Sequence, residues 1–418
     1  KTAVAALSCG MTSETWPNIR PSLRGGTFGI QSFFLASAIF VYAVAGSPTP
    51  DKLSFTEVLT GLLLVLASAN FSFQKIHEAA PRWRIRAQTL LLYGLSVPVF
   101  MAFTAGTELA AIIRDVIPFL FMLIPFFIQS PTGDKFACVV WTGMILTAGV
   151  LFAARTAAHP LIHWLTGHKP VMADPLYLAN APTVLFSALL LIGLAGRHLY
   201  EGATLPRTIS AALMLAVSAV PLAAMILAKQ RASFMAVLIY VGGLLLAAVI
   251  HRPRRAAFPL LALIALALAT GGVGLKIYHV MALKTELVGA NMRWQEAFAV
   301  FDSLDDDPLA VLFGKGWGAH VASPAVGGET VNFTHSLLTS YWLKTGLCGL
   351  ILVLLYLFEI GLLLLKEMKE RPVLAAAIAL PLLIDTFLYA SFKSLDFGLI
   401  LLLIPLWASE VASQGQKI

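Results

Sequence analysis

Three basic side chains that suit a phosphorylated substrate lie in separate segments of the second half of the chain. They are Arg231 in "AKQRAS", Arg293 in "NMRWQEAF" and His335 in "VNFTHS". Two guanidinium groups can hold a diphosphate through paired hydrogen bonds, and an imidazole can accept a proton near neutral pH. These residue types favour transfer of a group from a diphosphate carrier, provided that the fold brings the three segments to one face.

Each of the three residues also has a simpler interpretation. His335 precedes a long apolar run, where a histidine often serves as a helix cap or an interfacial polar residue. Arg231 could extend toward lipid headgroups at the end of a span, and Arg293 could lie on the solvated face of an amphipathic helix. Sequence spacing alone leaves both interpretations open.

Two further basic residues are candidates for contacts with phosphate. Arg155 follows an apolar run at its expected outer end, and Lys393 lies with Asp396 in the short turn "SFKSLD" before the last apolar run. Either side chain could instead hold a helix end at the membrane surface.

The sequence does not predict a metal site. The acidic run "DSLDDDP" at 302–308 resembles a solvated helix end more than a divalent-ion site. Three histidines in "RTAAHPLIHWLTGHK" have spacings that could ligate zinc, but no cysteine or carboxylate completes the set: His159, His163 and His168.

The composition is that of a membrane protein. Of the 418 residues, 58% are hydrophobic and 12% are charged, and the mean hydropathy is +0.83. Such a chain has too little polar surface for a soluble protein, so the sequence predicts a polytopic membrane protein. The net charge of +7 comes from basic residues in short loops, and no basic stripe with interleaved aromatic residues suggests nucleic acid.

About twelve apolar runs are long enough to span a bilayer, and they must be helical because the hydrocarbon core offers the backbone no water. The fold class is therefore all-α. The runs centre on residues 28–46, 53–71, 88–104, 109–129, 136–154, 181–196, 208–227, 232–250, 256–275, 337–365, 373–391 and 395–412.

The basic loops set the expected orientation. "FQKIHEAAPRWRIR", "GRHLYEGATLPR", "HRPRR" and "KEMKERP" fall on one side of the alternating pattern, which places them and both termini in the cytoplasm. The chain is then one transmembrane domain, 1–418, with a first external loop at 155–180 and a large one at 276–335. The turns that carry Arg231 and Lys393 lie on the same external side.

The large loop contains a predicted amphipathic helix. Apolar residues recur at helical spacing in "TELVGANMRWQEAFAVFDSL", whereas Arg293, Gln295 and Glu296 lie off that stripe. The stripe comprises Leu287, Trp294, Ala297, Phe298, Phe301 and Leu304. Such a helix lies on the membrane surface or packs over the bundle. The segment "FGKGWG" then predicts a tight glycine-rich turn before the chain returns to the membrane at His335.

These motifs resemble the O-antigen ligase and polymerase superfamily. The resemblance rests on "QRAS", "NMRWQEAF", "FGKGWG" and the block "NFTHSLLTSYWLKTGLCG", in which His335 is followed by Thr345, Gly346, Leu347 and Gly349. It covers residues 229–349 at the level of motifs, and the hydropathy pattern extends it over most of the chain. "FTHS" stands where many relatives carry Pro-His-Asn.

The resemblance implies a GT-C-type membrane glycosyltransferase without a cofactor or metal. By analogy, an O-antigen ligase would move a glycan from undecaprenyl diphosphate to the lipid A-core oligosaccharide, on the periplasmic face of a Gram-negative inner membrane. It maps the catalytic roles onto His335, Arg231 and Arg293. Asn332, with Arg155 and Lys393, becomes a candidate contact for diphosphate or glycan. The glycan, the acceptor sugar and the oligomeric state stay open.

Two alternatives remain at this stage. An O-antigen polymerase would use the same donor and topology but extend a carrier-linked glycan. A lipid or solute transporter would place charged residues near the bilayer midplane and show two matching halves. The sequence offers Asp385 as the main acidic residue inside a span, and the ionisable residues otherwise gather at the membrane faces.

Overall fold

The structure is a computed structural model. It describes residues 26–47, 55–69, 71, 80–128, 135–166, 178–202, 204–251, 253, 279 and 292–415. The span expected at 256–275, the stripe residue Leu287 and the candidate ligand His168 lie outside these residues.

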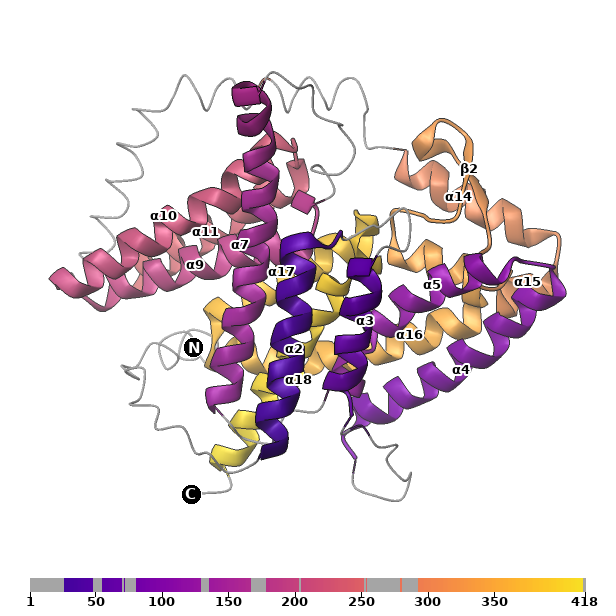
Figure 1. The fold of residues 1–418 in the computed structure, drawn as a ribbon, viewed down its shortest axis with the longest axis horizontal. Coiled ribbons are helices and arrows are strands. Elements are labelled where there is room, and N and C mark those ends of the chain that lie inside the picture. The colour runs from indigo at the N-terminus through magenta and orange to yellow at the C-terminus, as the bar shows by residue number, and fades with distance from the viewer. Residues whose placement is uncertain are drawn as a thin grey trace.

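The described elements are almost all helices (Figure 1). The bundle helices before the large loop are α2 (Gly26–Ala45), α3 (Phe55–Ala67), α4 (Arg82–Thr104), α5 (Leu109–Met122), α6 (Ile124–Phe127), α7 (Lys135–Thr166), α9 (Pro182–Glu201), α10 (Leu205–Leu227) and α11 (Arg231–His251). The loop holds α14 (Arg293–Asp305), α15 (Pro308–Phe313), β1 (Val321–Ser323), η1 (Pro324–Val326) and β2 (Glu329–Val331). The last helices are α16 (Leu337–Glu370), α17 (Pro372–Phe387), η2 (Ala390–Lys393) and α18 (Leu395–Gly415).

The chain is an all-α membrane protein. Among the described residues, six helices are long and apolar enough to cross a membrane: α4, α7, α9, α10, α11 and α16. Shorter apolar helices occupy Gly29–Ala45, Phe55–Ala67, Pro372–Phe387 and Leu395–Ser409. These ten segments coincide with ten of the expected spans, whereas the full count of twelve stays a prediction.

Two expected boundaries differ from the observed ones. The run at 109–129 is divided at Leu123 into α5 and α6, because Pro125 has no N–H to continue the helix and its ring crowds the preceding turn. The run at 136–154 continues as α7 to Thr166, so the first part of the predicted loop at 155–180 is helical.

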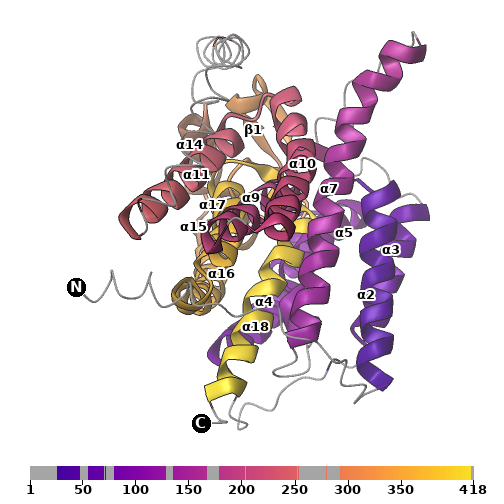
Figure 2. The same cartoon turned by 90° about the vertical axis from the view of Figure 1, so that its left-hand side faces the viewer.

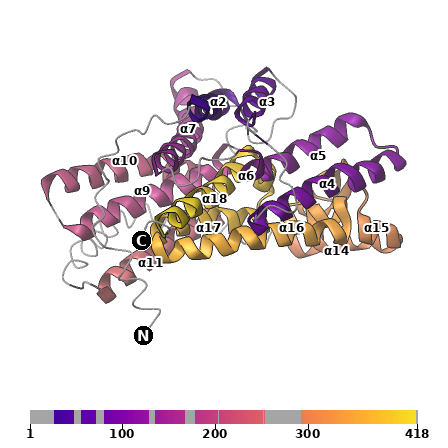
Figure 3. The same cartoon turned by 90° about the horizontal axis from the view of Figure 1, so that it is seen from below.

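The helices form two connected groups (Figures 1 and 2). The helix α9 packs against α7, α10 and α17, while α2 packs against α3 and α7 at one edge of the molecule. The helix α16 packs against α4, α15, α17 and α18. Seen from below, α14 and α15 lie beside α16, and α15 also contacts α4 (Figure 3). The predicted loop helix therefore covers one end of the bundle.

A small hairpin follows the loop helices. β1 and β2 pair antiparallel, with Val321 opposite Val331 and Ser323 opposite Glu329. The hairpin packs on α14, since α14 contacts both β1 and η1. It therefore connects the glycine-rich turn to the segment that ends at His335.

The glycine-rich turn caps a break in α16. Gly346 has φ 66° and ψ −175°, which interrupts the helix and leaves three carbonyl groups without helical partners. The Lys315 and Gly316 N–H groups donate to the carbonyls of Leu343 and Lys344 at 2.9 and 3.0 Å. The Tyr93 hydroxyl donates to the Thr345 carbonyl at 2.8 Å. The turn "FGKGWG" and the helix break in "TGLCG" are thus joined by hydrogen bonds into one structural unit.

Replacing Gly346 by alanine is expected to destabilise the protein. A Cβ there would lie 2.3 Å from the Leu312 backbone, and the positive φ is unfavourable for alanine. We expect the free energy of unfolding to fall by about 1–3 kcal/mol or more. Gly361→Ala in the same helix is the matched control, because its Cβ would meet open space. Thermal unfolding in detergent measures both, and equal melting temperatures would contradict the prediction.

Candidate functional site: a buried carboxylate–histidine pair

The clearest arrangement for chemistry joins His335 to Glu296. The imidazole Nδ1 lies 3.0 Å from Glu296 Oε1, and the His335 backbone N–H donates to Oε2 at 2.9 Å. The Ser323 hydroxyl donates to Oε1 at 2.6 Å. The Glu296 side chain is 2% exposed and that of His335 is 20% exposed. The carboxylate is therefore buried behind an imidazole that still reaches the surface.

The partners of Glu296 keep its carboxyl group ionised. Burial alone would raise the pKa of Glu296, but the hydrogen bonds from His335 and Ser323 outweigh it and lower the pKa below the ordinary value. An ionised carboxylate only accepts hydrogen bonds, so the Nδ1 of a neutral His335 carries the ring proton. Its Nε2 is then a free proton acceptor.

Glu296 belongs to the buried face of α14, which corrects one expectation. The predicted helix is confirmed, but its buried residues are Glu296, Val300 and Leu304. The aromatic side chains of the predicted stripe are instead exposed, with Trp294 at 74% and Phe298 at 64%. The pattern missed this because a membrane protein can direct an apolar stripe toward lipid while it buries a carboxylate that has partners.

Arg293 stands at the first position of α14, one turn before Glu296. Its Nη1 is buried and has no hydrogen-bond partner in the described structure. Burial lowers the pKa of the guanidinium, an effect that Glu296 and Tyr389 partly offset. A buried guanidinium N–H without an acceptor is costly, and an anionic ligand would satisfy it.

Tyr389 connects Arg293 electrostatically with Arg231. Burial raises the pKa of the Tyr389 hydroxyl, while hydrogen bonds with Ser233 and the Ala232 backbone and the charge of Arg231 lower it. The same hydroxyl affects Arg293. The structure therefore brings Arg231, Arg293 and His335 into one neighbourhood, in the order Arg231, Tyr389, Arg293, Glu296 and His335.

Both arginines begin a helix after a strained residue. Within the described ranges, Lys229 and Met292 are the non-glycine residues with positive φ, and each has φ 52°. Lys229 precedes α11 and Met292 precedes α14. Such conformations cost about 1–3 kcal/mol and are often found at functional sites. The positive ends of the two helix dipoles add to the arginine charges, which makes this region suited to an anion.

Lys393 and Asn332 belong to a second, buried network beside this site. Asp115 on α5 pairs with Lys344 at 2.6 Å and lies 3.7 Å from the Lys393 Nζ. Both ammonium groups donate to the Asn332 carbonyl, at 2.6 Å from Lys344 and 3.1 Å from Lys393. The Gly318 N–H also donates to Asp115. This network holds the chain three residues before His335.

Asp396, which lies in the same turn as Lys393, has other partners. Asp396 accepts hydrogen bonds from the hydroxyls of Tyr42 and Thr183, both at 2.5 Å. Lys393 instead lies 5.9 Å from the ring centre of Phe333, which contacts the His335 ring. Burial and the neighbouring Lys344 ammonium lower the pKa of Lys393, and Asp115 partly offsets them.

Arg155 has a different position. Its Nη1 donates to the carbonyls of Ala43 and Gly46, each at 2.9 Å, and its guanidinium lies 5.6 Å from the Phe152 ring centre. Free carbonyls and the negative dipole end make a helix C-terminus a natural partner for arginine. Arg155 therefore holds the end of α2, while its suggested contact with phosphate stays a prediction.

The expectation that ionisable residues lie mostly at the membrane faces was incomplete. Asp115 and Lys344 are buried within the apolar runs expected at 109–129 and 337–365, in addition to Asp385. Lys344 was overlooked because it is a single charge in an apolar run, and Asp115 because it follows Arg114 directly. Their pairing depends on contacts between distant helices, which a local pattern does not reveal.

The buried network predicts unequal effects of removing its charges. Asp115→Asn would leave two buried ammonium groups, whereas Lys344→Met would leave Asp115 with Lys393. We expect Asp115→Asn to cost about 3–5 kcal/mol, as for one partner lost from a buried ion pair, and Lys344→Met to cost less. Thermal unfolding of both variants at neutral pH tests this order, and a larger loss for Lys344→Met would contradict it.

The acidic run at 302–308 has structural roles. Asp302, Asp305 and Asp306 are exposed, and the Asp307 carboxylate accepts a hydrogen bond from the Leu309 N–H at the start of α15. In the part of the chain that the structure describes, no group of three or more His, Cys, Asp or Glu residues is placed to hold a metal ion.

The fold and the site define a class of protein: an all-α membrane protein with a carboxylate–histidine pair beside two arginines at helix N-termini. A scan against protein-family models finds no match for this chain. No curated protein matches it at a significant level either. The family resemblance therefore depends on the motifs alone.

Proposed function

We propose that the chain is a membrane glycosyltransferase that takes its glycan from a lipid-linked diphosphate. The observation that carries this proposal is the buried Glu296–His335 pair one helical turn from Arg293, whose buried Nη1 has no hydrogen-bond partner in the described structure. A proton acceptor next to an unfilled anion site suits a reaction in which a hydroxyl attacks while a diphosphate leaves.

His335 is the proposed general base. Its Nε2 accepts the proton of an acceptor sugar hydroxyl as the hydroxyl oxygen forms a bond to the anomeric carbon of the donor. The bond from that carbon to the diphosphate oxygen breaks, and the electron pair leaves with the diphosphate. Attack opposite to the leaving group inverts the anomeric centre. Glu296 stabilises the imidazolium that forms and fixes the orientation of its ring.

The two arginines stabilise the departing diphosphate. Arg293 offers a buried N–H that already lacks a partner, so it needs little reorganisation when negative charge develops. The Tyr389 hydroxyl bonds with Ser233 and the Ala232 backbone and feels the charge of Arg231, which supports placing Arg231 in the same region. Their guanidinium groups supply the positive charge that other transferases take from a divalent ion, so the proposed mechanism is metal-independent.

The motif resemblance narrows the proposal to an O-antigen ligase with the GT-C architecture. The donor is then an undecaprenyl-diphosphate-linked glycan and the acceptor is lipid A-core. The site would face the periplasm from a Gram-negative inner membrane, with both termini in the cytoplasm. A ligase and a polymerase would break the same bond, so the chemistry of the motifs suits both reactions equally.

The proposal is tested by transfer in vitro. Wild type and His335→Ala are each mixed with undecaprenyl-diphosphate glycan and lipid A-core in detergent with EDTA, and the product is read as a gel shift of lipopolysaccharide. A shift with wild type only supports a metal-independent ligase. Lengthening of the carrier-linked glycan instead would identify a polymerase. No change in either lipid would overturn the proposal and favour a transporter.

A further inference from the structure

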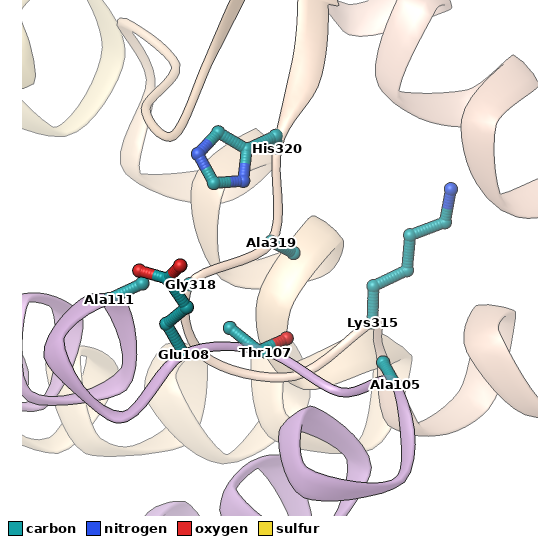
Figure 4. A pocket seen from close by; sticks show the side chains of 8 residues that line it. All are labelled: Ala105, Thr107, Glu108, Ala111, Lys315, Gly318, Ala319 and His320. Atoms are coloured by element: carbon teal, nitrogen blue, oxygen red, sulfur yellow. The ribbon is translucent and has the colours of Figure 1, made fainter.

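A pocket of about 330 Å³ lies between the α4–α5 turn and the start of the hairpin (Figure 4). Half of its lining consists of small residues: Ala105, Ala111, Gly318 and Ala319. Thr107, Glu108, Lys315 and His320 complete the lining. Figure 4 shows the side chains of Glu108 and His320 on one side and that of Lys315 on the other.

The polar side chains of this pocket are not used elsewhere in the described structure. The side chains of Glu108, Lys315 and His320 make no hydrogen bond or ion pair with the residues that the structure describes, and nothing in the proposed transfer uses them. Glu108 accepts hydrogen bonds, Lys315 donates them, and a neutral imidazole does both. With one positive and one negative charge, the set suits a neutral ligand with many hydroxyls better than an ion.

The walls of the pocket are firmly held. The Gly318 N–H donates to Asp115 at 2.6 Å, and the buried Trp317 indole donates to the Gly94 carbonyl at 2.7 Å. The Lys315 N–H donates to the Leu343 carbonyl. The segment 315–320 is thus fixed against α4, α5 and α16 before any ligand binds, which lowers the entropic cost of binding.

β1 connects the pocket to the Glu296–His335 pair. His320 immediately precedes β1, and Ser323 at its end donates to Glu296. An extended strand rises about 3.3 Å per residue, so His320 and Ser323 are about 10 Å apart. Arg231 and Arg293 lie toward the opposite end of the series that runs from Arg231 through Tyr389, Arg293 and Glu296 to His335. Figures 1 and 3 likewise show α14 between α11 and the α4–α5 turn.

We infer that this pocket binds a sugar unit of the acceptor glycan, a short distance from the hydroxyl that His335 deprotonates. The inference rests on the proposed function for the identity of the acceptor. In an inverting displacement, the nucleophile and the leaving group lie on opposite sides of the reacting carbon. The arginines define the side of the leaving diphosphate, so we place the acceptor at the end of β1 away from Ser323 and Glu296, where the pocket lies.

Direct binding tests the inference without relying on transfer. His335→Ala protein in nanodiscs is titrated with the core oligosaccharide released from lipid A, and saturation-transfer NMR measures affinity. Adding Glu108→Gln and His320→Ala should weaken binding at least about tenfold, since each replaced side chain loses a hydrogen bond. Adding Lys366→Ala, an exposed lysine on α16, should change nothing.

Equal affinity in the pocket variants, or no binding by the His335→Ala parent, would overturn the inference. Transfer by the wild-type protein is measured separately. A protein that binds the oligosaccharide through the pocket but transfers no glycan would keep this inference and refute the proposed function. A protein that transfers glycan and binds the oligosaccharide equally well without these side chains would refute this inference and keep the proposed function.

Discussion

Replacing Glu296 by glutamine is expected to lower the turnover number of glycan transfer by about 10² to 10⁴-fold. The carboxylate accepts the Nδ1 proton of His335 at 3.0 Å, which leaves Nε2 free to accept a proton. The amide of glutamine can donate to Nδ1 instead, and the ring proton then moves to Nε2, where it blocks the base. The loss should appear in kcat, with the KM values for donor and acceptor little changed.

Stability measurements separate this effect from simple unfolding. Glutamine keeps the volume, its carbonyl oxygen can still accept from the His335 backbone N–H, and the Ser323 hydroxyl can accept from its amide group, so the fold should survive. Because the pKa of Glu296 is lowered in the fold, its ionised form stabilises the protein above the ordinary glutamate pKa, and this contribution disappears as the pH falls through the folded value. The difference in melting temperature between wild type and variant should therefore narrow in acid.

Two variants serve as controls for Glu296. Glu329→Gln changes an exposed glutamate in the same loop and should retain full activity. Glu296→Asp keeps the charge but shortens the reach, so it should restore part of the turnover that glutamine loses. Full activity of Glu296→Gln would remove the carboxylate from the mechanism and leave His335 to act alone.

The sequence predicted those features that depend on local composition. Apolar runs defined most helices, because a lipid environment leaves the backbone no alternative to a helix. The chemistry of Arg231, Arg293 and His335 was also inferred from residue type, and the shared external side predicted that they could meet. The structure brings them into one neighbourhood through Tyr389 and Glu296.

The missing parts of the site depend on contacts between distant segments. Glu296 looked solvated because it lies off the apolar stripe, yet His335 and Ser323 satisfy it in a buried position. Tyr389 gave no signal at all, since a single tyrosine near the end of an expected span is common at membrane interfaces. A useful signal for Glu296 was its position three residues after Arg293, which places both side chains within one helical turn.

Replacing Arg293 by lysine is expected to lower kcat/KM by about 10² to 10³-fold, comparable to the loss of one donor to a developing anion. Lysine keeps the positive charge but lacks the planar fork that binds two phosphate oxygens at once. The melting temperature should not fall, because the Arg293 Nη1 makes no hydrogen bond within the described fold. An unfilled, buried donor contributes to ligand binding and not to folding.

Arg371→Lys provides the opposite control for this argument. The Arg371 Nη1 donates to Glu367 at 2.7 Å, and its guanidinium lies 4.6 Å from the Trp407 ring centre. Lysine should therefore lower the melting temperature there while the folded fraction keeps its specific activity. If Arg293→Lys behaved like Arg371→Lys, Arg293 would be a structural residue, and the diphosphate would have to be bound elsewhere. If Arg293→Lys loses activity but keeps its melting temperature, while Arg371→Lys does the opposite, Arg293 acts in ligand binding and Arg371 in folding.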